Sequence, residues 1–421
     1  MLSVLKHFEL CAMSTSNVCG QDTNELRLIL SLSFASMVIF INLYLVQGML
    51  PLIADAFSVT KSHATLLLSV TSFTMAFSLL LFAVLSDRVG RKKPILVSLY
   101  LLVILDFCAL FITEFSQLVM LRMLQGALLA SVPAMAMAYF KDELGNNALL
   151  KAGAIYIAAN SVGGIAGRLL GGAMAQYLDW QQAMALLTGV SLIGTLIVSY
   201  LLPKSHFLKP ELELGKWPLK KSDFKGFCYH LADPKLRLMY LVGGLAFMVM
   251  VNQFSYIQLH LMDSPFNLGR FEVTLIFLCY LSGTYASYRS AKWVAKQGVK
   301  RVFIYSVLAL LAGTLLTLAD HLTAIFMGFL ISAFGFFLIH SSCNAWVAYR
   351  AKEHRAKATA LYLCSYYLGA AMGGPYLLPF WNLWGWQGVV LGSVIALTIL
   401  ALVVLKLVNS KSQSGQLALE S

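Results

Sequence analysis

Long apolar segments separated by short polar connections run along almost the whole of the 421-residue chain. A helix needs about 20 mostly apolar residues to cross the hydrocarbon core of a bilayer, so each segment is a candidate membrane span. Twelve such segments occur, six on either side of a Lys-rich stretch: 28–53, 64–85, 94–113, 117–140, 149–177, 183–202, 238–261, 272–290, 302–319, 323–348, 358–381 and 388–408. The sequence therefore predicts an all-α polytopic membrane protein with twelve transmembrane helices.

Composition agrees with this class. Charged residues make up 12% of the chain, hydrophobic residues 59%, and the mean hydropathy is +0.75. A soluble domain carries about twice that share of charge. The net charge of +12 would indicate nucleic acid as a partner of a soluble protein. In this chain, the positions of the basic residues explain the positive charge in another way.

Lys and Arg are distributed unevenly between the two sets of loops. If both termini and the central stretch lie on one side, that side holds 27 of the 31 basic residues. The opposite loops hold Lys61 and Arg270, and Arg122 and Arg168 lie within spans. By the positive-inside rule both termini are cytoplasmic. The charge is thus a topology signal, and no nucleic-acid partner is needed.

The expected organisation is a cytoplasmic tail (1–26), a six-helix bundle (27–202), a cytoplasmic linker (203–237), a second bundle (238–408) and a second tail (409–421). A short surface helix is expected in the linker around "DFKGFCYHL". Met1 and Met13 are both possible starts. The seven cysteines show no metal-ligand spacing and are expected to be free thiols. Without a Walker loop, metal motif or nucleophile elbow, we expect neither an enzyme nor a cofactor.

The two halves repeat one another, as in transporters built by duplication. At a constant offset of 206 residues, five residues in and just after the fifth span match five in and just after the eleventh: Tyr156, Gly163, Gly167, Trp180 and Gln181 with Tyr362, Gly369, Gly373, Trp386 and Gln387. The loop after the eighth span aligns with the loop after the second. In this alignment Gly90 matches Gly298, whereas Asp87 is replaced by Ala295. We therefore predict two pseudo-symmetric six-helix bundles.

Three motifs carry a resemblance to a known family. The loop after the second span reads Asp87, Arg88, Gly90, Arg91 and Lys92; the fourth span holds Arg122, Gln125 and Gly126; the fifth holds Gly163, Gly167, Arg168, Gly171 and Gly172. Over about 27–408 the chain resembles the major facilitator superfamily, and most closely its bacterial drug and sugar-efflux permeases. Arg168 stands where the antiporter branch of that family has a proline.

The resemblance implies a secondary active transporter, with proton-coupled efflux of a small organic solute by alternating access. It implies a monomer in a bacterial inner membrane, whose partners are the lipid bilayer, a small-molecule substrate and protons. Two alternatives stay open. One is an uptake symporter or facilitator of the same fold, and the other is a non-transporting membrane sensor built on the same scaffold.

The loop motif is expected to form a conformational gate of Asp87, Arg88, Gly90 and Arg91. Asp87 would face the N-terminus of the eleventh helix, near Thr359. A carboxylate gains about 0.3–1 kcal/mol at such a terminus. The two halves would then be latched on the cytoplasmic side, with Arg88 and Arg91 holding the acid. The other interpretation is that the cluster only enforces topology.

Charges inside the bilayer are costly and are often functional. Asp106 is the one acid deep in a span, and the short connection between spans three and four places it at the depth of Arg122. We expect them to pair, or to share a network with Arg168, either as a proton-coupling site or as a static ion pair. Arg168 itself would bind a carboxylate or phosphate of the substrate, or satisfy backbone carbonyls between helices five and eight.

A substrate cavity is expected between the halves. Its predicted lining is Asn42, Tyr44, Gln47, Arg122, Gln125, Asn160, Arg168, Asn252, Gln253, His340, Asn344, Tyr362 and Tyr366. Two arginines and one aspartate disfavour cationic drugs and favour neutral polyols, sugars or anionic metabolites. Some of these polar groups would only join helices, at about 0.6 kcal/mol each. Gly126, Gly163, Gly167, Gly171, Gly172, Gly369 and Gly373 are expected to pack helices closely.

Overall fold

The computed structural model describes residues 16–203, 221–319 and 321–409, all in helices and short connections. The first half of the chain forms α2 (Ser16–Gly48), α3 (Leu50–Ala56), α4 (Lys61–Ala64), α5 (Leu66–Val89), α6 (Lys92–Cys108), η2 (Ala109–Phe111), α7 (Phe115–Leu129), α8 (Ser131–Glu143), α9 (Asn146–Tyr177) and α10 (Trp180–Leu201). The second half forms α11 (Lys221–Ala232), α12 (Pro234–Met262), η3 (Glu272–Cys279), α13 (Tyr280–Leu316), α14 (Leu322–Arg350) and α15 (Arg355–Asn409). Residues 1–15 and 410–421 of the predicted tails and residues 204–220 of the predicted linker lie outside these ranges.

The predicted twelve spans are confirmed. Nine stretches of the described residues are long and apolar enough to cross a membrane. Two of them are hairpins of two spans each, because α13 is interrupted at Gly298 and α15 at Trp384 and Gly385. The 32-residue helix α9 completes the set. Several helices extend beyond the apolar runs, as α2 does, because hydropathy marks only the part of a helix that lies within the hydrocarbon core.

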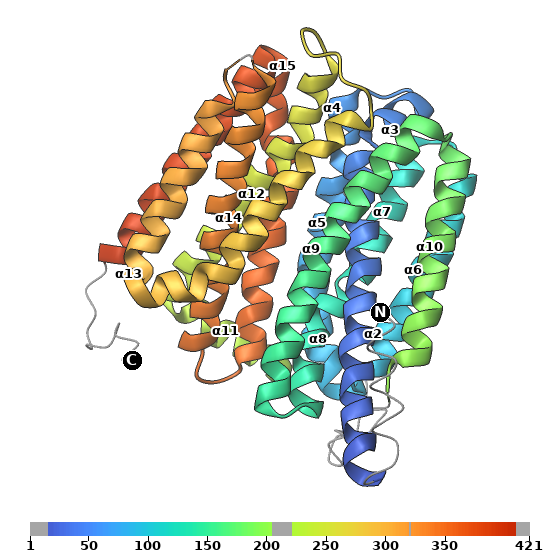
Figure 1. Cartoon of the computed structure of the whole chain (residues 1–421), viewed down its shortest axis with the longest axis vertical. Coiled ribbons are helices and arrows are strands. Elements are labelled where there is room, and N and C mark those ends of the chain that lie inside the picture. The colour runs from blue at the N-terminus through green and yellow to red at the C-terminus, as the bar shows by residue number, and fades with distance from the viewer. Residues whose placement is uncertain (1–15, 204–220, 320, 410–421) are drawn as a thin grey trace.

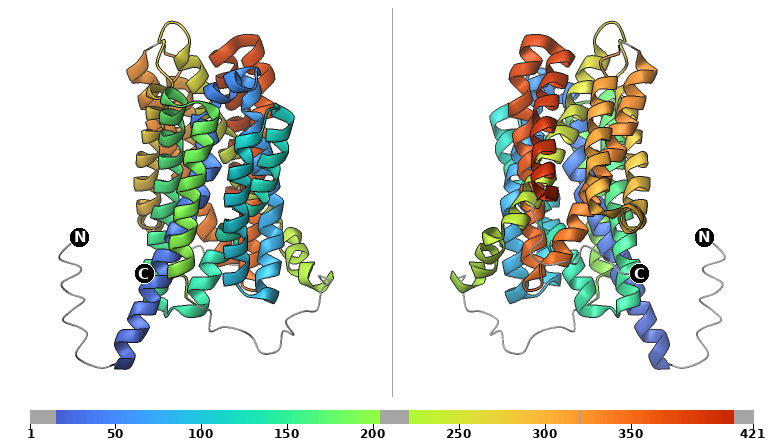
Figure 2. Two further views of the ribbon diagram at one scale, coloured as in Figure 1. Left: turned by 90° about the vertical axis from the view of Figure 1, so that its right-hand side faces the viewer. Right: turned by 90° about the vertical axis from the view of Figure 1, so that its left-hand side faces the viewer.

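The helices of each half gather together, blue to green on one side and yellow to red on the other (Figure 1). The hairpin turns of α2–α3 and of α15 lie at one end of the molecule. The start of α2, the bend of α13 and the surface helix α11 lie at the other (Figures 1 and 2). In the predicted topology the first is the outer end and the second the cytoplasmic end, and these two names are kept below.

The sequence repeat recurs in the geometry. Trp180 Nε1 donates to the Ala109 carbonyl at 3.1 Å, and its counterpart Trp386 donates to the Thr317 carbonyl at 3.0 Å. Gly90 and Gly298 adopt nearly the same left-handed conformation, with φ of 82° and 80°, where a side chain would be strained. Each glycine turns the chain between two spans at the cytoplasmic end.

Glycines on α9 bring it against the backbone of α2. A Cβ atom at Gly163 would lie 2.9 Å from Met37 Cα, and one at Gly167 would lie 2.7 Å from the Ile41 carbonyl oxygen. These positions recur every four residues, so they form one ridge of small residues. Gly171 continues this ridge, and Gly172 faces Thr274 of the second half.

The equivalent pair in the second half, α12 and α15, packs more tightly. A Cβ atom at Gly369 would lie 1.9 Å from the Gly244 carbonyl oxygen, and one at Gly373 would lie 2.4 Å from the Met248 carbonyl oxygen. Both contacts are to backbone, which cannot rotate away as a side chain can. These two glycines therefore set the distance between α12 and α15.

An ion pair joins α12 to the end of α14 at the cytoplasmic end. Asp233 caps α12 by accepting from the backbone N–H of Lys235 at 2.9 Å, and Arg350 Nε donates to its Oδ2 at 2.7 Å. Partial burial raises the pKa of Asp233, but the hydrogen bonds from Arg350 and from the backbone outweigh that effect, so the pKa lies below its ordinary value. The contact is partly solvated, with the Arg350 and Asp233 side chains 36% and 24% exposed.

Replacement of Arg350 by Gln tests this pair. A carboxyl group whose pKa is lower in the folded state contributes stability above its ordinary pKa of about 3.9 and loses it as the pH falls through the folded value. We expect Arg350→Gln to melt about 1–2 °C below the parent at neutral pH, because such pairs are worth less than about 1 kcal/mol. Differential scanning fluorimetry should show the difference in melting temperature between the two proteins decreasing below about pH 4. A difference in melting temperature that does not change with pH would contradict a stabilising ion pair between Arg350 and Asp233.

Candidate functional site

Asp106, the one described acid deep in a span, is fully buried in the first half. Its Oδ1 accepts a hydrogen bond from Gln125 Nε2 at 2.8 Å, and its Oδ2 accepts one from Ser191 Oγ at 2.6 Å. Asn42 Nδ2 in turn donates to Ser191 Oγ at 2.9 Å. The carboxylate on α6 is thereby connected to α7, α10 and α2 by neutral partners.

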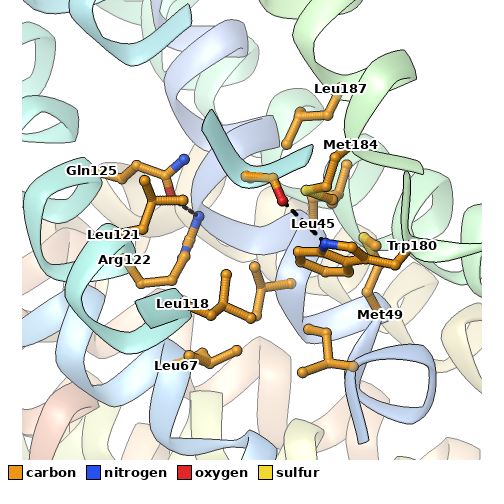
Figure 3. Close-up of a pocket in the computed structure, with 13 residues that line it drawn as sticks. Leu45, Met49, Leu67, Leu118, Leu121, Arg122, Gln125, Trp180, Met184 and Leu187 are labelled. Atoms are coloured by element: carbon orange, nitrogen blue, oxygen red, sulfur yellow. Dashed lines mark hydrogen bonds between the residues drawn. The ribbon is translucent and has the colours of Figure 1, made fainter. Parts of the chain in front are cut away.

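Arg122 does not contact Asp106 directly, so the predicted direct pair is replaced by a bridged one. Its Nη1 donates at 2.9 Å to Gln125 Oε1 (Figure 3). The amide nitrogen of Gln125 in turn donates to Asp106. Arg122 Nε donates to Thr71 Oγ1 at 3.1 Å. Both terminal nitrogens also approach the backbone carbonyl of Asn42 at 3.4 Å. The guanidinium thus binds α5 and α2, and reaches the acid through Gln125.

The spacing of the α7 motif explains this geometry. Residues three apart share a helix face, so Arg122 and Gln125 point the same way. Gly126 allows the close approach of α5, because a Cβ atom there would lie 2.3 Å from the Thr71 carbonyl oxygen. A cavity of about 10 Å³, with room for at most one water, borders Arg122 and Gln125. Apolar side chains and Trp180 line its other walls (Figure 3).

Arg168 occupies a separate site between the two halves and is 2% exposed. Its Nε donates to Gln47 Oε1 at 2.8 Å, and its Nη1 to the carbonyl of Gly164, on its own helix, at 2.9 Å. The guanidinium carbon lies 3.7 Å from the ring centre of Tyr44 and 4.8 and 4.7 Å from those of Phe277 and Tyr280. No described hydrogen bond joins Arg168 to the Asp106 network, so the predicted three-way network is split in two.

Gln47 links the Arg168 site to the second half. Its Nε2 donates to the Val251 carbonyl at 2.9 Å and to Ser255 Oγ at 2.8 Å, both on α12. Together with the rings of Phe277 and Tyr280, these bonds hold the first half against the second. Arg168, Gln47 and Tyr44 are therefore the predicted cavity residues that lie at the seam between the halves.

Several other predicted cavity residues join helices within one half. Asn42, Arg122 and Gln125 belong to the Asp106 network, and the side-chain carbonyl of Asn160 accepts from Ser36 of α2. Asn252 donates to the Ala370 carbonyl and Gln253 to Thr314 Oγ1. For these residues the structure favours helix joining over substrate contact.

An aromatic group in the second half surrounds His340. The Tyr362 hydroxyl lies 2.9 Å from His340 Nδ1, and the Tyr366 ring lies 4.6 Å from the His340 ring and 3.7 Å from that of Phe247. Asn344, one helical turn beyond His340, has a buried side-chain oxygen without a described partner.

The predicted gate falls partly outside the described residues. Asp87 and Arg88 lie in the last turn of α5, but their side chains are not described, so their roles stay predictions. Arg91 Nε donates to Asp142 Oδ2 at 2.6 Å and its Nη1 to Ser86 Oγ at 2.8 Å. Arg91 therefore ties this loop to the end of α8.

The outer end holds contacts that sequence analysis did not identify. Arg270, after α12, forms an ion pair with Asp55 of α3, and its Nη1 donates to the Ala175 carbonyl of α9 at 3.1 Å. Lys61 of α4 approaches Asp263 at 4.0 Å. Each pair joins the first half to the second, so the structure is closed at its outer end.

Ser191, Thr71, Phe277 and Tyr280 were also missed as site residues. Serine, threonine and aromatic residues are common in membrane helices, so none stood out as a signal in the sequence. Arg270 was conspicuous only as one of two basic residues in the outer loops.

Comparison with known proteins identifies the family. The sequence matches the Major Facilitator Superfamily over residues 32–258 and 239–421. It is 34% identical to the uncharacterized MFS-type transporter YybF of Bacillus subtilis over 364 residues, 86% of this chain and 88% of that protein. It is also 34% identical to the inner membrane transport protein YnfM of Escherichia coli over 375 residues, 89% of this chain and 88% of that one.

Solved structures share the fold. The chain resembles the nucleoside transporter NupG with a TM-score of 0.74 at 13% identity, and the human organic anion transporter TETRAN with 0.68 at 18%. Each comparison covers 91% of this chain and 99% of the other. Likeness at such low identity concerns the fold alone. The sequence matches, the twelve spans and the two related halves together show that this chain belongs to the major facilitator superfamily and is a multi-pass transmembrane transporter, not an enzyme.

Proposed function

We propose that this transporter exports a small organic solute across the inner membrane of a bacterium in exchange for protons, by alternating access. The observation that carries proton coupling is the buried Asp106. It lies within the membrane and contacts neutral Gln125 and Ser191, with a cation one side chain away. An ionisable group at this depth that is not locked in a direct ion pair is suited to gain and lose a proton during transport.

Alternating access requires that the closed outer end can open. The charged contacts there are two ion pairs, and the Asp55 and Arg270 side chains of one of them are 58% and 34% exposed. Exposed pairs contribute less than about 1 kcal/mol each, so they can break within a transport cycle. The proposed cytoplasmic gate at Asp87 would latch the opposite end in the alternate state.

Flux measurement tests the proposal. The full-length protein is reconstituted into liposomes with a pH gradient, and proton movement is followed with a pH-sensitive dye while a panel of sugars, organic anions and drugs is added. Solute-dependent proton movement opposite to solute flux supports exchange. Movement in the same direction shows a symporter, and no proton movement with any transported solute overturns coupling.

Loss of Arg270 is expected to favour opening of the outer end. In a cysteine-free background, Ser69→Cys places one thiol on α5 at a buried position beside Gly374 of α15. Adding Arg270→Gln should raise the labelling rate by a membrane-impermeant thiol reagent about fivefold, the change that about 1 kcal/mol produces. Arg237→Gln, which removes an exposed charge from α12, is the control. Equal rates in all three proteins would show that Arg270 does not hold this end closed.

A further inference from the structure

Arg168 is a buried cation without a carboxylate partner. Among the described residues it forms no ion pair, and its contacts are an amide oxygen, a backbone carbonyl and three aromatic rings. Asp106, the one described acid deep in a span, is bound to Gln125 and Ser191. A guanidinium withdrawn from water and left without an anion is costly, so a residue kept in this state is a candidate for binding one.

A second buried group beside Arg168 also lacks a partner. The hydroxyl of Tyr280, whose ring lies under the guanidinium, has no hydrogen-bond partner among the described residues. A buried hydroxyl without a partner is destabilising unless something else accepts its hydrogen. An anion placed against Arg168 would supply acceptors for both the guanidinium and this hydroxyl.

The surroundings of Arg168 are aromatic. Tyr44, Phe277 and Tyr280 contact the guanidinium. Faces and edges of aromatic rings suit a flat apolar body, with offset-stacked or edge-to-face contacts. The combination of one cation, one free hydroxyl and several rings fits a planar ring that carries a carboxylate.

We propose that Arg168 and the Tyr280 hydroxyl bind the carboxylate of a small aromatic acid, the substrate class of this transporter. This inference rests on the proposed transport function. The bound anion would compete with Gln47 and the rings of Phe277 and Tyr280 for the guanidinium. Because those contacts join the halves, binding loosens the closed seam and thereby promotes opening of the outer end. The membrane potential, negative inside, then favours outward movement of the anion.

Binding to the purified full-length protein tests the proposal. Isothermal titration calorimetry is run with benzoate and phenylacetate and with their uncharged amides, benzamide and phenylacetamide. We expect the parent protein to bind at least one acid at millimolar concentration or below and at least tenfold more tightly than its amide. Arg168→Gln should abolish this preference, and Arg168→Lys should keep part of it. Arg237→Gln, which removes an exposed arginine, should bind as the parent does.

Tyr280→Phe keeps the test decisive if Arg168→Gln fails to fold. It removes only a hydroxyl that has no described protein partner, so the fold should be retained. We expect it to bind the acid about three- to tenfold more weakly and the amide little changed. Undetectable binding of both acids, equal affinity for acid and amide, or an unaltered preference in Arg168→Gln or Tyr280→Phe overturns the proposal.

Flux separates this inference from the proposed function. Proton-coupled export of a neutral solute, with no acid preference in binding, would overturn the inference and leave the function standing. If the acids bind in a manner that depends on Arg168 but no solute drives proton movement, the inference stands and the proposed proton coupling is overturned.

Discussion

Gly369→Ala is expected to remove most of the correctly folded protein. The added methyl group would lie 1.9 Å from the Gly244 carbonyl oxygen, far inside van der Waals contact. The obstacle is backbone of α12, so relief requires α12 and α15 to move apart along their whole contact. Overpacking that side chains can absorb costs about 1–3 kcal/mol, and we expect about 3 kcal/mol or more here. Fluorescence-detected gel filtration should show loss of the monodisperse peak and a much lower melting temperature.

Gly189→Ala is the matched control. Gly189 lies within α10, and a Cβ atom there would meet nothing within 4 Å. Alanine is the better helix former by about 1 kcal/mol, so this variant should match or exceed the parent in stability. Gly163→Ala, the repeat counterpart of Gly369→Ala, should fall between them because its closest contact is 2.9 Å. Melting temperatures that do not follow this order would refute packing as the role of Gly369.

The number of spans and the repeat could be predicted from sequence because each depends on local or periodic properties of the chain. Hydropathy alone marks a membrane span, and the equivalence of Gly90 with Gly298 needed only an alignment of the halves. The reason for those two glycines, a positive φ at each, is visible only in the structure. Helix ends were predicted less well, since α12 begins at Pro234 rather than near 238.

The partners of the buried charges could not be predicted in the same way. Arg122 and Gln125 share one face of α7, and spacing does not tell which of them reaches Asp106. That choice depends on the rotation of α7 and α6 about their axes, which distant packing sets. Ser191 and Asp106 are 85 residues apart, and Asp55 and Arg270 are 215 apart. Such contacts follow from the tertiary arrangement and leave no local pattern.

Asp106→Asn is expected to abolish coupling between protons and solute while sparing solute exchange. Asparagine has the shape of aspartate but cannot carry a proton on and off. It can still accept from Gln125 and can donate to Ser191 Oγ, so the contacts of α6 with α7 and α10 are retained. In proteoliposomes, a pH gradient should no longer drive solute accumulation, whereas exchange between equal pools of solute should continue. Exchange measured in the same vesicles reports the amount of folded transporter.

The loss of this carboxylate also leaves Arg122 without its nearest negative charge, and an uncompensated buried charge can cost about 3–5 kcal/mol. The double variant Asp106→Asn, Arg122→Gln removes both charges and should regain stability without regaining coupling. Ser191→Ala is the control for altered hydrogen bonding, since it takes one donor from the carboxylate but leaves the ionisable group. A proton site predicts coupling in Ser191→Ala and none in either Asp106 variant. A pH gradient that still drives solute accumulation in Asp106→Asn vesicles, as in those of the parent, would contradict the proton site. Asp106 would then be a structural member of the α6–α7–α10 contact, and the proton pathway would lie elsewhere.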